Sequence, residues 1–136
     1  MSEAAGELAG ITVLVADDSE TIRYATQSLL ERKGARVLTA VDGFEALAAI
    51  ADGRPDLVFA DVMMPRIDGY QLCALVKANA VFRSIPVVML SAREGAFEAA
   101  RSRMAGSEEH LGKPFTEDEL AAVVARHVSP RSAAAH

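Results

Sequence analysis

The sequence predicts an α/β fold in which helices cover both faces of a five-stranded parallel sheet. Short apolar runs of strand length alternate with amphipathic segments of helix length along residues 11–128. The strand runs are almost wholly apolar, which is typical of strands that are buried on both faces. Every crossover between successive strands is expected to be right-handed.

Most of the expected strands end at a polar residue. The first covers residues 11–16 and stops at Asp17, and the third covers residues 57–60 and stops at Asp61. The remaining strands are expected at residues 36–41, 86–90 and 109–111, the last being the weakest. After Asp61 come two methionines, a proline and Asp-Gly, a composition typical of a sharp turn away from the sheet.

The segments between the strands have the periodicity of amphipathic helices. The first helix is expected after an N-cap at Ser19. Its predicted apolar face consists of Ile22, Ala25, Leu29 and Leu30. The second is expected to open at residues 42–43 and to end at Gly53, because Pro55 prevents its continuation.

The later helices follow the same pattern. Residues 69–79 are expected to bury Leu72, Leu75 and Val76, and a weaker helix is expected over residues 95–104. The last helix is expected to start at Thr116, since threonine followed by glutamate three residues later has the spacing of a capping box.

The composition indicates one globular domain. The chain has 136 residues, of which 51% are hydrophobic and 24% charged. We expect a flexible leader over residues 1–10, the folded domain over 11–128 and a flexible tail over 129–136. The net charge of −5 argues against nucleic-acid binding, because phosphate affinity needs clustered cations.

The sequence also limits the compartment and the kinds of site. Cys73 is the single cysteine, so neither an internal disulfide nor a Cys/His metal site is expected. No apolar run approaches the length of a membrane span, and the N-terminus lacks the features of a signal peptide. We therefore expect a cytoplasmic protein that is not inserted into a membrane.

Polar residues at the strand ends are expected to converge. In a parallel sheet the carboxyl ends of the strands share one edge, so Asp17, Asp18, Asp61, Ser91 and Lys113 should meet there. Three neighbouring carboxylates repel one another unless cations compensate, and a lysine with an oxygen-bound Mg²⁺ would do so. A carboxylate can itself be a nucleophile, so the pattern favours phosphoryl transfer onto an aspartate.

Four motifs give this pattern a family resemblance. VADDS at 15–19, DVMMPRIDG at 61–69, MLSA at 89–92 and KPF at 113–115 resemble the CheY-like receiver domains of response regulators. The closest likeness, strongest over residues 42–77, is to stand-alone chemotaxis-type regulators of twitching motility. The resemblance implies a flavodoxin-like (βα)5 doubly wound fold with strand order 2-1-3-4-5.

The resemblance implies a role for each acid. Asp61 would accept a phosphoryl group from a CheA-like histidine kinase or a phosphotransfer domain. Asp18 would bind Mg²⁺ directly, Asp17 would hold a metal-bound water or support the metal, and the backbone carbonyl of Met63 would complete the coordination. Lys113 would pair first with the aspartate and then with the phosphoryl group.

The resemblance also implies how the signal leaves the site. Ser91 and Ala92 would bind the phosphoryl group, Ser91 would move toward it, and a cis peptide bond at Pro114 would aim the lysine. The family's switch aromatic is replaced by His110, whose imidazole titrates, so weaker or pH-dependent switching is expected.

Two further positions would set how long the phosphoryl group persists. Met63 lies two residues after Asp61, and Arg93 lies two residues after Ser91. An apolar methionine cannot orient an attacking water as a polar side chain does, so slow self-hydrolysis is expected.

The expected output is a protein contact rather than turnover of an external substrate. The face formed by residues 95–128 would bind an effector protein, and the chain would be a monomer or a weak phosphorylation-dependent dimer. Alternatives are a degenerate receiver that acts as a scaffold and an aspartyl-nucleophile phosphatase of the haloacid-dehalogenase type. The latter needs an acid where this chain has Met63. No GxGxxG motif follows the first strand, which excludes a dinucleotide-binding domain.

Overall fold

The computed structural model describes residues 6–92 and 96–128, in which strands and helices alternate. The strands are β1 (Thr12–Ala16), β2 (Arg36–Ala40), β3 (Leu57–Asp61), β4 (Val87–Ser91) and β5 (Glu109–Gly112). The helices are α1 (Glu20–Arg32), α2 (Gly43–Gly53), α3 (Gly69–Ala78), α4 (Ala96–Met104) and α5 (Glu117–His127). All strand pairs are parallel and their order is β2-β1-β3-β4-β5, which confirms the predicted fold class.

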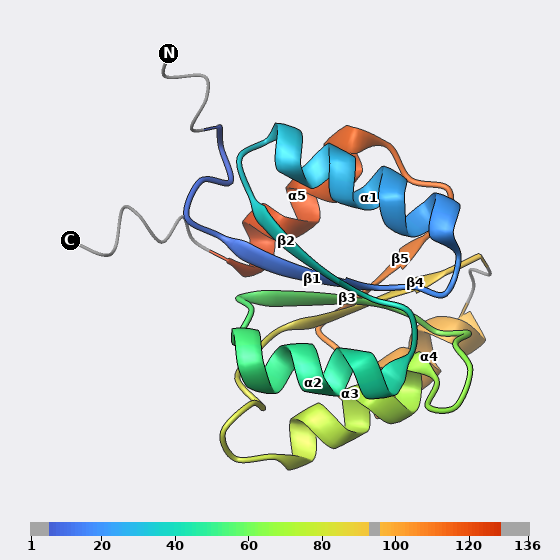
Figure 1. Ribbon diagram of the computed structural model, residues 1–136. Helices are drawn as coiled ribbons and strands as arrows, with labels where there is room; N and C mark the ends of the chain where they lie inside the picture. Colours follow the sequence, from blue (N-terminus) through green and yellow to red (C-terminus); the bar gives the residue numbers. More distant parts are fainter. Residues whose placement is uncertain (1–5, 93–95, 129–136) are drawn as a thin grey trace.

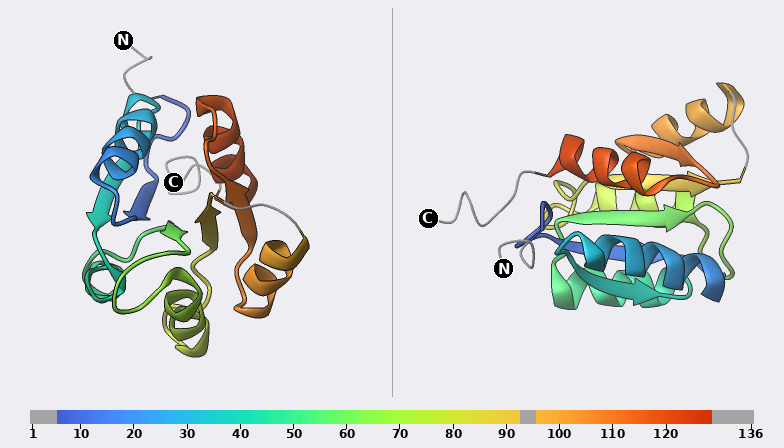
Figure 2. Two further views of the ribbon diagram at one scale, coloured as in Figure 1. Left: turned by 90° about the vertical axis from the view of Figure 1, so that its right-hand side faces the viewer. Right: turned by 90° about the horizontal axis from the view of Figure 1, so that it is seen from above.

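The sheet lies between two layers of helices (Figures 1 and 2). Helices α1 and α5 cover one face, and α2, α3 and α4 cover the other. Neighbouring residues of β3 therefore face different layers. Phe59 belongs to a buried cluster with Leu30 of α1, whereas Val58 belongs to a second cluster with Leu72 of α3. Every residue of β3 and β4 is buried, as expected for central strands of a doubly covered sheet.

The strand register sets the carboxyl ends of the strands at one edge. Ala16 of β1 lies opposite Ala60 of β3, and Ser91 of β4 lies opposite Gly112 of β5. The residues that follow these positions include the predicted acids and the predicted lysine. They therefore start from the same edge of the sheet.

Side-chain caps fix where the helices begin. Ser19 accepts a hydrogen bond from the backbone of Ile22, as predicted for the first helix. The predicted capping box between Thr116 and Glu119 is present, and Asp68 and Gln71 form a second one.

Helix α2 ends at Gly53 as predicted, but a different residue makes the turn. Arg54 takes the left-handed conformation, with φ 44°, and its N–H donates to the carbonyl of Ile50. A Cβ on Gly53 would lie 2.6 Å from Cδ1 of Leu38, so the end of that side chain would have to shift to admit another residue.

Two predicted core positions are wrong. Ala25 is exposed, and the buried residue on that side of α1 is Thr26, whose hydroxyl donates to the carbonyl of Ile22 at 2.7 Å. Leu75 is 47% exposed, because the buried stripe of α3 runs through Leu72, Cys73 and Val76. A small alanine or a single leucine beside the stripe fits the periodicity without belonging to the core.

The packed part of the chain begins before Ile11, which differs from the expectation of a loose leader. Leu8 is 2% exposed, and its N–H donates to the carbonyl of Lys33 at 2.8 Å. Glu7 forms an ion pair with the same lysine. Residues 1–5 and the predicted tail 129–136 lie outside the described residues. Among the helices described here, none has the length and apolar character needed to cross a membrane.

Candidate functional site

Asp61 is the last residue of β3 and lies at the carboxyl edge of the sheet. It is only 6% exposed. One carboxylate oxygen, Oδ1, accepts a hydrogen bond from the N–H of Met63 at 3.3 Å. The turn behind it is tight, because a Cβ on Gly69 would lie 2.3 Å from the Asp61 carbonyl oxygen. Glycine at this position thus allows α3 to start directly against the phosphoacceptor candidate.

Lys113 connects the two buried acids. Its Nζ lies 2.9 Å from Oδ2 of Asp17 and 3.2 Å from Oδ1 of Asp61. The N–H of Lys113 donates to the carbonyl of Ser91, and the peptide bond to Pro114 is cis. The lysine therefore reaches the site from the end of β5 across a separation of 96 residues from Asp17.

Asp17 is wholly buried and fully engaged. Besides Lys113, its Oδ1 accepts a hydrogen bond from the N–H of Ser19 at 2.9 Å. Its backbone carbonyl accepts one from Arg23 at 2.8 Å. These contacts hold the start of α1 against the site.

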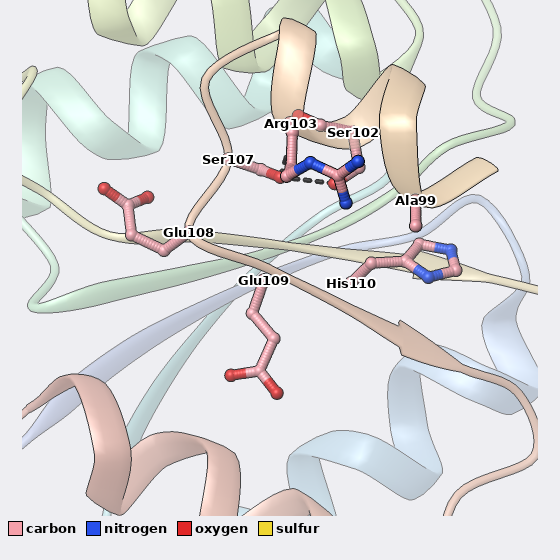
Figure 3. A pocket seen from close by; sticks show the side chains of 7 residues that line it. All are labelled: Ala99, Ser102, Arg103, Ser107, Glu108, Glu109 and His110. Carbon is pink, nitrogen blue, oxygen red and sulfur yellow. Dashed lines mark hydrogen bonds between the residues drawn. The ribbon is translucent and has the colours of Figure 1, made fainter. Parts of the chain in front are cut away.

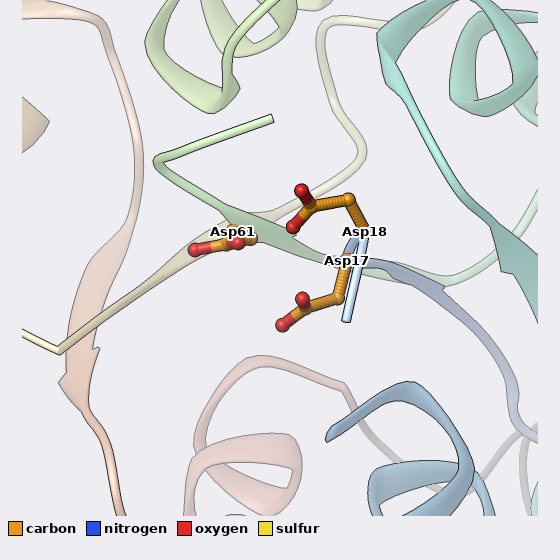
Figure 4. A group of neighbouring side chains, drawn as sticks. All are labelled: Asp17, Asp18 and Asp61. Atoms are coloured by element: carbon orange, nitrogen blue, oxygen red, sulfur yellow. The ribbon is translucent and has the colours of Figure 1, made fainter. Parts of the chain in front are cut away.

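The three acids form a compact oxygen cluster (Figure 4). One carboxylate oxygen from each of Asp17, Asp18 and Asp61 lies within 4.8 Å of the other two. Asp18 differs from the other acids because it is exposed. It lines a depression of about 360 Å³ together with Met63, Met64, Pro65 and Asp68. The cluster thus offers a divalent cation oxygen ligands on one side and room for water on the other.

Burial and charge alter the protonation of the site. Burial, reinforced by the Asp17 carboxylate, raises the pKa of Asp61 from 3.8 to about 6, although Lys113 and the Met63 N–H oppose this rise. Burial by itself favours the neutral amine of Lys113, but its contacts with Asp17 and Asp61 raise the pKa of the lysine. The lysine is therefore held as a cation beside the acids.

The remaining predicted site residues lie around this cluster. Ser91 is 1% exposed, Ala92 follows it at the surface, and both line a cavity of about 330 Å³ with Met63. The Met63 side chain is 75% exposed. Arg93 lies outside the described residues. The structure thus brings together the predicted acids, the lysine and Ser91.

His110 projects from β5 toward α4, on the side of the strand opposite to Glu109 (Figure 3). It lines the α4–β5 cavity of about 270 Å³, whose other residues are Ala99, Ser102, Arg103, Ser107, Glu108 and Glu109. Its Nε2 is buried and has no hydrogen-bond partner among the described residues. Glu109 instead forms an ion pair with Arg126, and one of its carboxylate oxygens lies 2.7 Å from Nε2 of His127; both partners belong to α5.

Comparison with known proteins identifies the family. Residues 13–125 match the response regulator receiver domain. The chain belongs to this family. Receiver domains are signalling modules of phosphorelays rather than enzymes that turn over external substrates, so the role of this chain is in a phosphorelay.

Individual relatives agree with this assignment. The chain is 51% identical over 119 residues to Protein PilG of Pseudomonas aeruginosa, covering 88% of each chain. It is 37% identical to response regulator MprA of Mycobacterium sp. strain KMS, but spans only 53% of the length of that relative. The structure of chemotaxis protein CheY4 of Vibrio cholerae matches with a TM-score of 0.83 at 30% identity, covering 87% of this chain and 98% of CheY4.

One polar cluster near the site was not predicted from the sequence. The hydroxyl of Tyr70 donates to Glu98 at 2.8 Å, and the guanidinium of Arg101 lies 4.5 Å from the centre of the Tyr70 ring. The sequence offered no signal for this cluster, because it depends on how α4 lies against α3.

Proposed function

We propose that Asp61 accepts a phosphoryl group and that the chain acts as a response regulator through a binding face that this group controls. The observation that supports the proposal is the Asp61 carboxylate, buried beside Lys113 within a cluster of acids. A buried carboxylate with one oxygen paired to a lysine keeps its second oxygen available as a nucleophile.

Phosphoryl transfer to Asp61 forms one bond to phosphorus and breaks another. A carboxylate oxygen of Asp61 forms a bond to phosphorus while the bond from phosphorus to the donor breaks. With a phosphohistidine donor, the bonding electrons return to the imidazole nitrogen. Lys113 then faces an acyl phosphate instead of a free carboxylate, and its charge stabilises the added negative charge. The Ser91 hydroxyl and the Ala92 backbone are proposed to bind the other phosphoryl oxygens.

The donor set fits Mg²⁺. Three carboxylates paired with a single lysine leave a net negative charge, and within the part of the chain that the structure describes this cluster offers hard oxygen ligands. Asp18 and Asp61 would hold the ion, Asp17 would support it through water, and the Met63 carbonyl would complete the protein ligands. When bound, Mg²⁺ would neutralise charge on the carboxylates and the phosphoryl oxygens.

The proposed output is a protein contact in the cytoplasm. A CheA-like histidine kinase or phosphotransfer domain would supply the phosphoryl group. An effector would bind the face formed by residues 95–128, of which the structure describes 96–128. Identity of 51% with PilG favours an effector in motility or pilus function. The chain would be a monomer or a weak phosphorylation-dependent dimer.

Labelling tests the proposal. With acetyl phosphate and Mg²⁺, intact mass of the wild type is expected to increase by one phosphoryl group. Asp61→Asn should gain none, and Asp52→Asn, which changes an exposed acid of α2 outside the cluster and its depression, should label like the wild type. Failure of the wild type to label would favour the scaffold interpretation.

A further inference from the structure

A polar cluster joins α4 to α3 beside the proposed phosphorylation site. The α3–α4 cluster consists of Tyr70, Glu98 and Arg101. Tyr70 directly follows Gly69, which abuts the carbonyl of Asp61. Burial, together with the hydrogen bond to Glu98, raises the pKa of Tyr70 to about 12, so its hydroxyl remains a donor near neutral pH. The Arg101 guanidinium lies against the ring of the same tyrosine at 4.5 Å.

The α3–α4 cluster shares a cavity with the phosphoryl-binding residues. This α3–α4 cavity of about 330 Å³ is lined by Val62, Met63, Tyr70, Ser91, Ala92, Glu98 and Arg101. Val62 and Met63 directly follow the phosphoacceptor, and Ser91 ends the neighbouring strand. A phosphoryl group on Asp61 would therefore add negative charge next to a cavity that holds one cation and one anion of α4.

The two charges of α4 would respond in opposite directions. Glu98 and Arg101 are three residues apart, so they lie on the same side of the helix. A phosphoryl group attracts the guanidinium, which binds phosphate oxygens well, and repels the carboxylate. Both responses weaken the contacts that α4 makes with Tyr70.

We propose that Arg101 is a phosphoryl-binding residue that couples the Asp61 site to α4. In the unphosphorylated chain the Arg101 guanidinium covers the Tyr70 ring, and Glu98 accepts a hydrogen bond from the Tyr70 hydroxyl. Once Asp61 is phosphorylated, Arg101 turns into the α3–α4 cavity and binds a phosphoryl oxygen, while Glu98 releases Tyr70. This frees α4 to change its position, and the route does not pass through His110. The inference rests on the proposed phosphorylation of Asp61.

Beryllium trifluoride with Mg²⁺ is the probe, because it binds an aspartate as a phosphoryl analogue. Its affinity is measured by amide NMR titration for the wild type, Arg101→Gln, Tyr70→Phe and the control Arg103→Gln. Loss of a charge-assisted hydrogen bond should weaken binding to Arg101→Gln by about tenfold or more. Tyr70→Phe removes the hydrogen bond to Glu98, which in the wild type must break when the probe binds. The affinity of this variant for the probe should therefore rise about threefold to tenfold.

The affinity for the probe should fall in Arg101→Gln and rise in Tyr70→Phe, and these opposite changes distinguish the proposal from a merely structural role of the two residues. Arg103→Gln removes an equal charge from the same helix and should bind like the wild type. The hydrogen exchange of α4 amides in Tyr70→Phe without the probe should approach that of the probe-bound wild type. If the wild type binds the probe but Arg101→Gln binds equally well, or Tyr70→Phe binds more weakly, the coupling proposal is wrong. If the wild type binds no probe, the proposed function fails first.

Discussion

Two regions of the same molecule differ in how completely their polar groups are paired. Around Asp61, the buried acids have a lysine, backbone N–H groups and each other within a few ångströms. Between α4 and β5, the Nε2 of His110 is buried without a described partner and faces a cavity of about 270 Å³. An unpaired buried nitrogen is costly in free energy, whereas a fully paired acid is held in place.

The difference indicates that the two regions have different tasks. A nucleophile must be fixed before its substrate arrives, since misplacement of the reacting atoms lowers the rate. A surface that reports the reaction must instead change at low free-energy cost. We therefore expect substitutions of Lys113 and Gly69 at the Asp61 site to lower the free energy of unfolding more than substitution of His110 in the α4–β5 cavity.

Removal of the lysine should have the largest effect. Lys113→Met leaves Asp17 and Asp61 buried without their shared cation, so the free energy of unfolding should fall by about 3–5 kcal/mol without metal. Urea unfolding measures this, and Lys113→Arg, which keeps the charge, should lose much less. A loss below about 1 kcal/mol for Lys113→Met would show that the pairing is not important for stability.

A side chain added at Gly69, in the turn behind Asp61, should have the second largest effect on stability. Gly69→Ala would place a Cβ 2.3 Å from the Asp61 carbonyl oxygen and 2.6 Å from Cε of Met89. We expect a loss of about 2–3 kcal/mol in urea unfolding and slower labelling by acetyl phosphate. Ala78→Gly at the end of the same helix tests for a general helix effect and should cost about 1 kcal/mol or less. Wild-type behaviour of Gly69→Ala would contradict the close packing.

Asp61 itself should be a source of instability near neutral pH. Its folded pKa of about 6 lies above the ordinary 3.8, so the folded state binds more protons between these values. Wild-type stability should therefore fall as pH rises through this window. Asp61→Asn should raise the free energy of unfolding by about 2 kcal/mol near pH 7.5 without metal, and by nearly nothing near pH 4. An equal effect at both pH values, in urea titrations, would contradict the assigned cause.

The Met63 side chain should affect the lifetime of the phosphoryl group rather than the fold. It is 75% exposed, so Met63→Asn should change the free energy of unfolding by less than about 0.5 kcal/mol. A polar side chain can orient the attacking water, and we expect dephosphorylation to accelerate about tenfold, or about 1.4 kcal/mol in barrier. The loss of labelled protein after removal of acetyl phosphate gives the rate. An unchanged rate would assign the lifetime to other residues.

Replacement of His110 should also have little effect on stability. His110→Tyr should change the free energy of unfolding by less than about 1 kcal/mol, because the α4–β5 cavity has room for a larger ring. The substitution should, however, change the α4 and β5 amide shifts induced by beryllium trifluoride, because His110 lines the cavity between these two elements. Unchanged shifts would show that His110 takes no part in the switch.

The sequence predicted the two regions unequally. Asp17, Asp61 and Lys113 were predictable because parallel strands bring their carboxyl ends to one edge, whatever the details of packing. The contact between Tyr70 and Glu98 could not be predicted, because it depends on the angle at which α4 lies on α3. Leu75 and Ala25 show the same limit: helical periodicity gives the apolar side but not the edge of the buried stripe.

Hydrogen exchange with and without beryllium trifluoride and Mg²⁺ tests the division between the regions most directly. We expect amides of β1 and β3 to keep their exchange rates within about twofold, while amides of α4 and β5 change by about tenfold or more. In Asp61→Asn, the exchange rates of both regions should stay the same when the probe is added. Equal changes in both regions, or changes confined to β1 and β3, would contradict a fixed site that is read through a movable face.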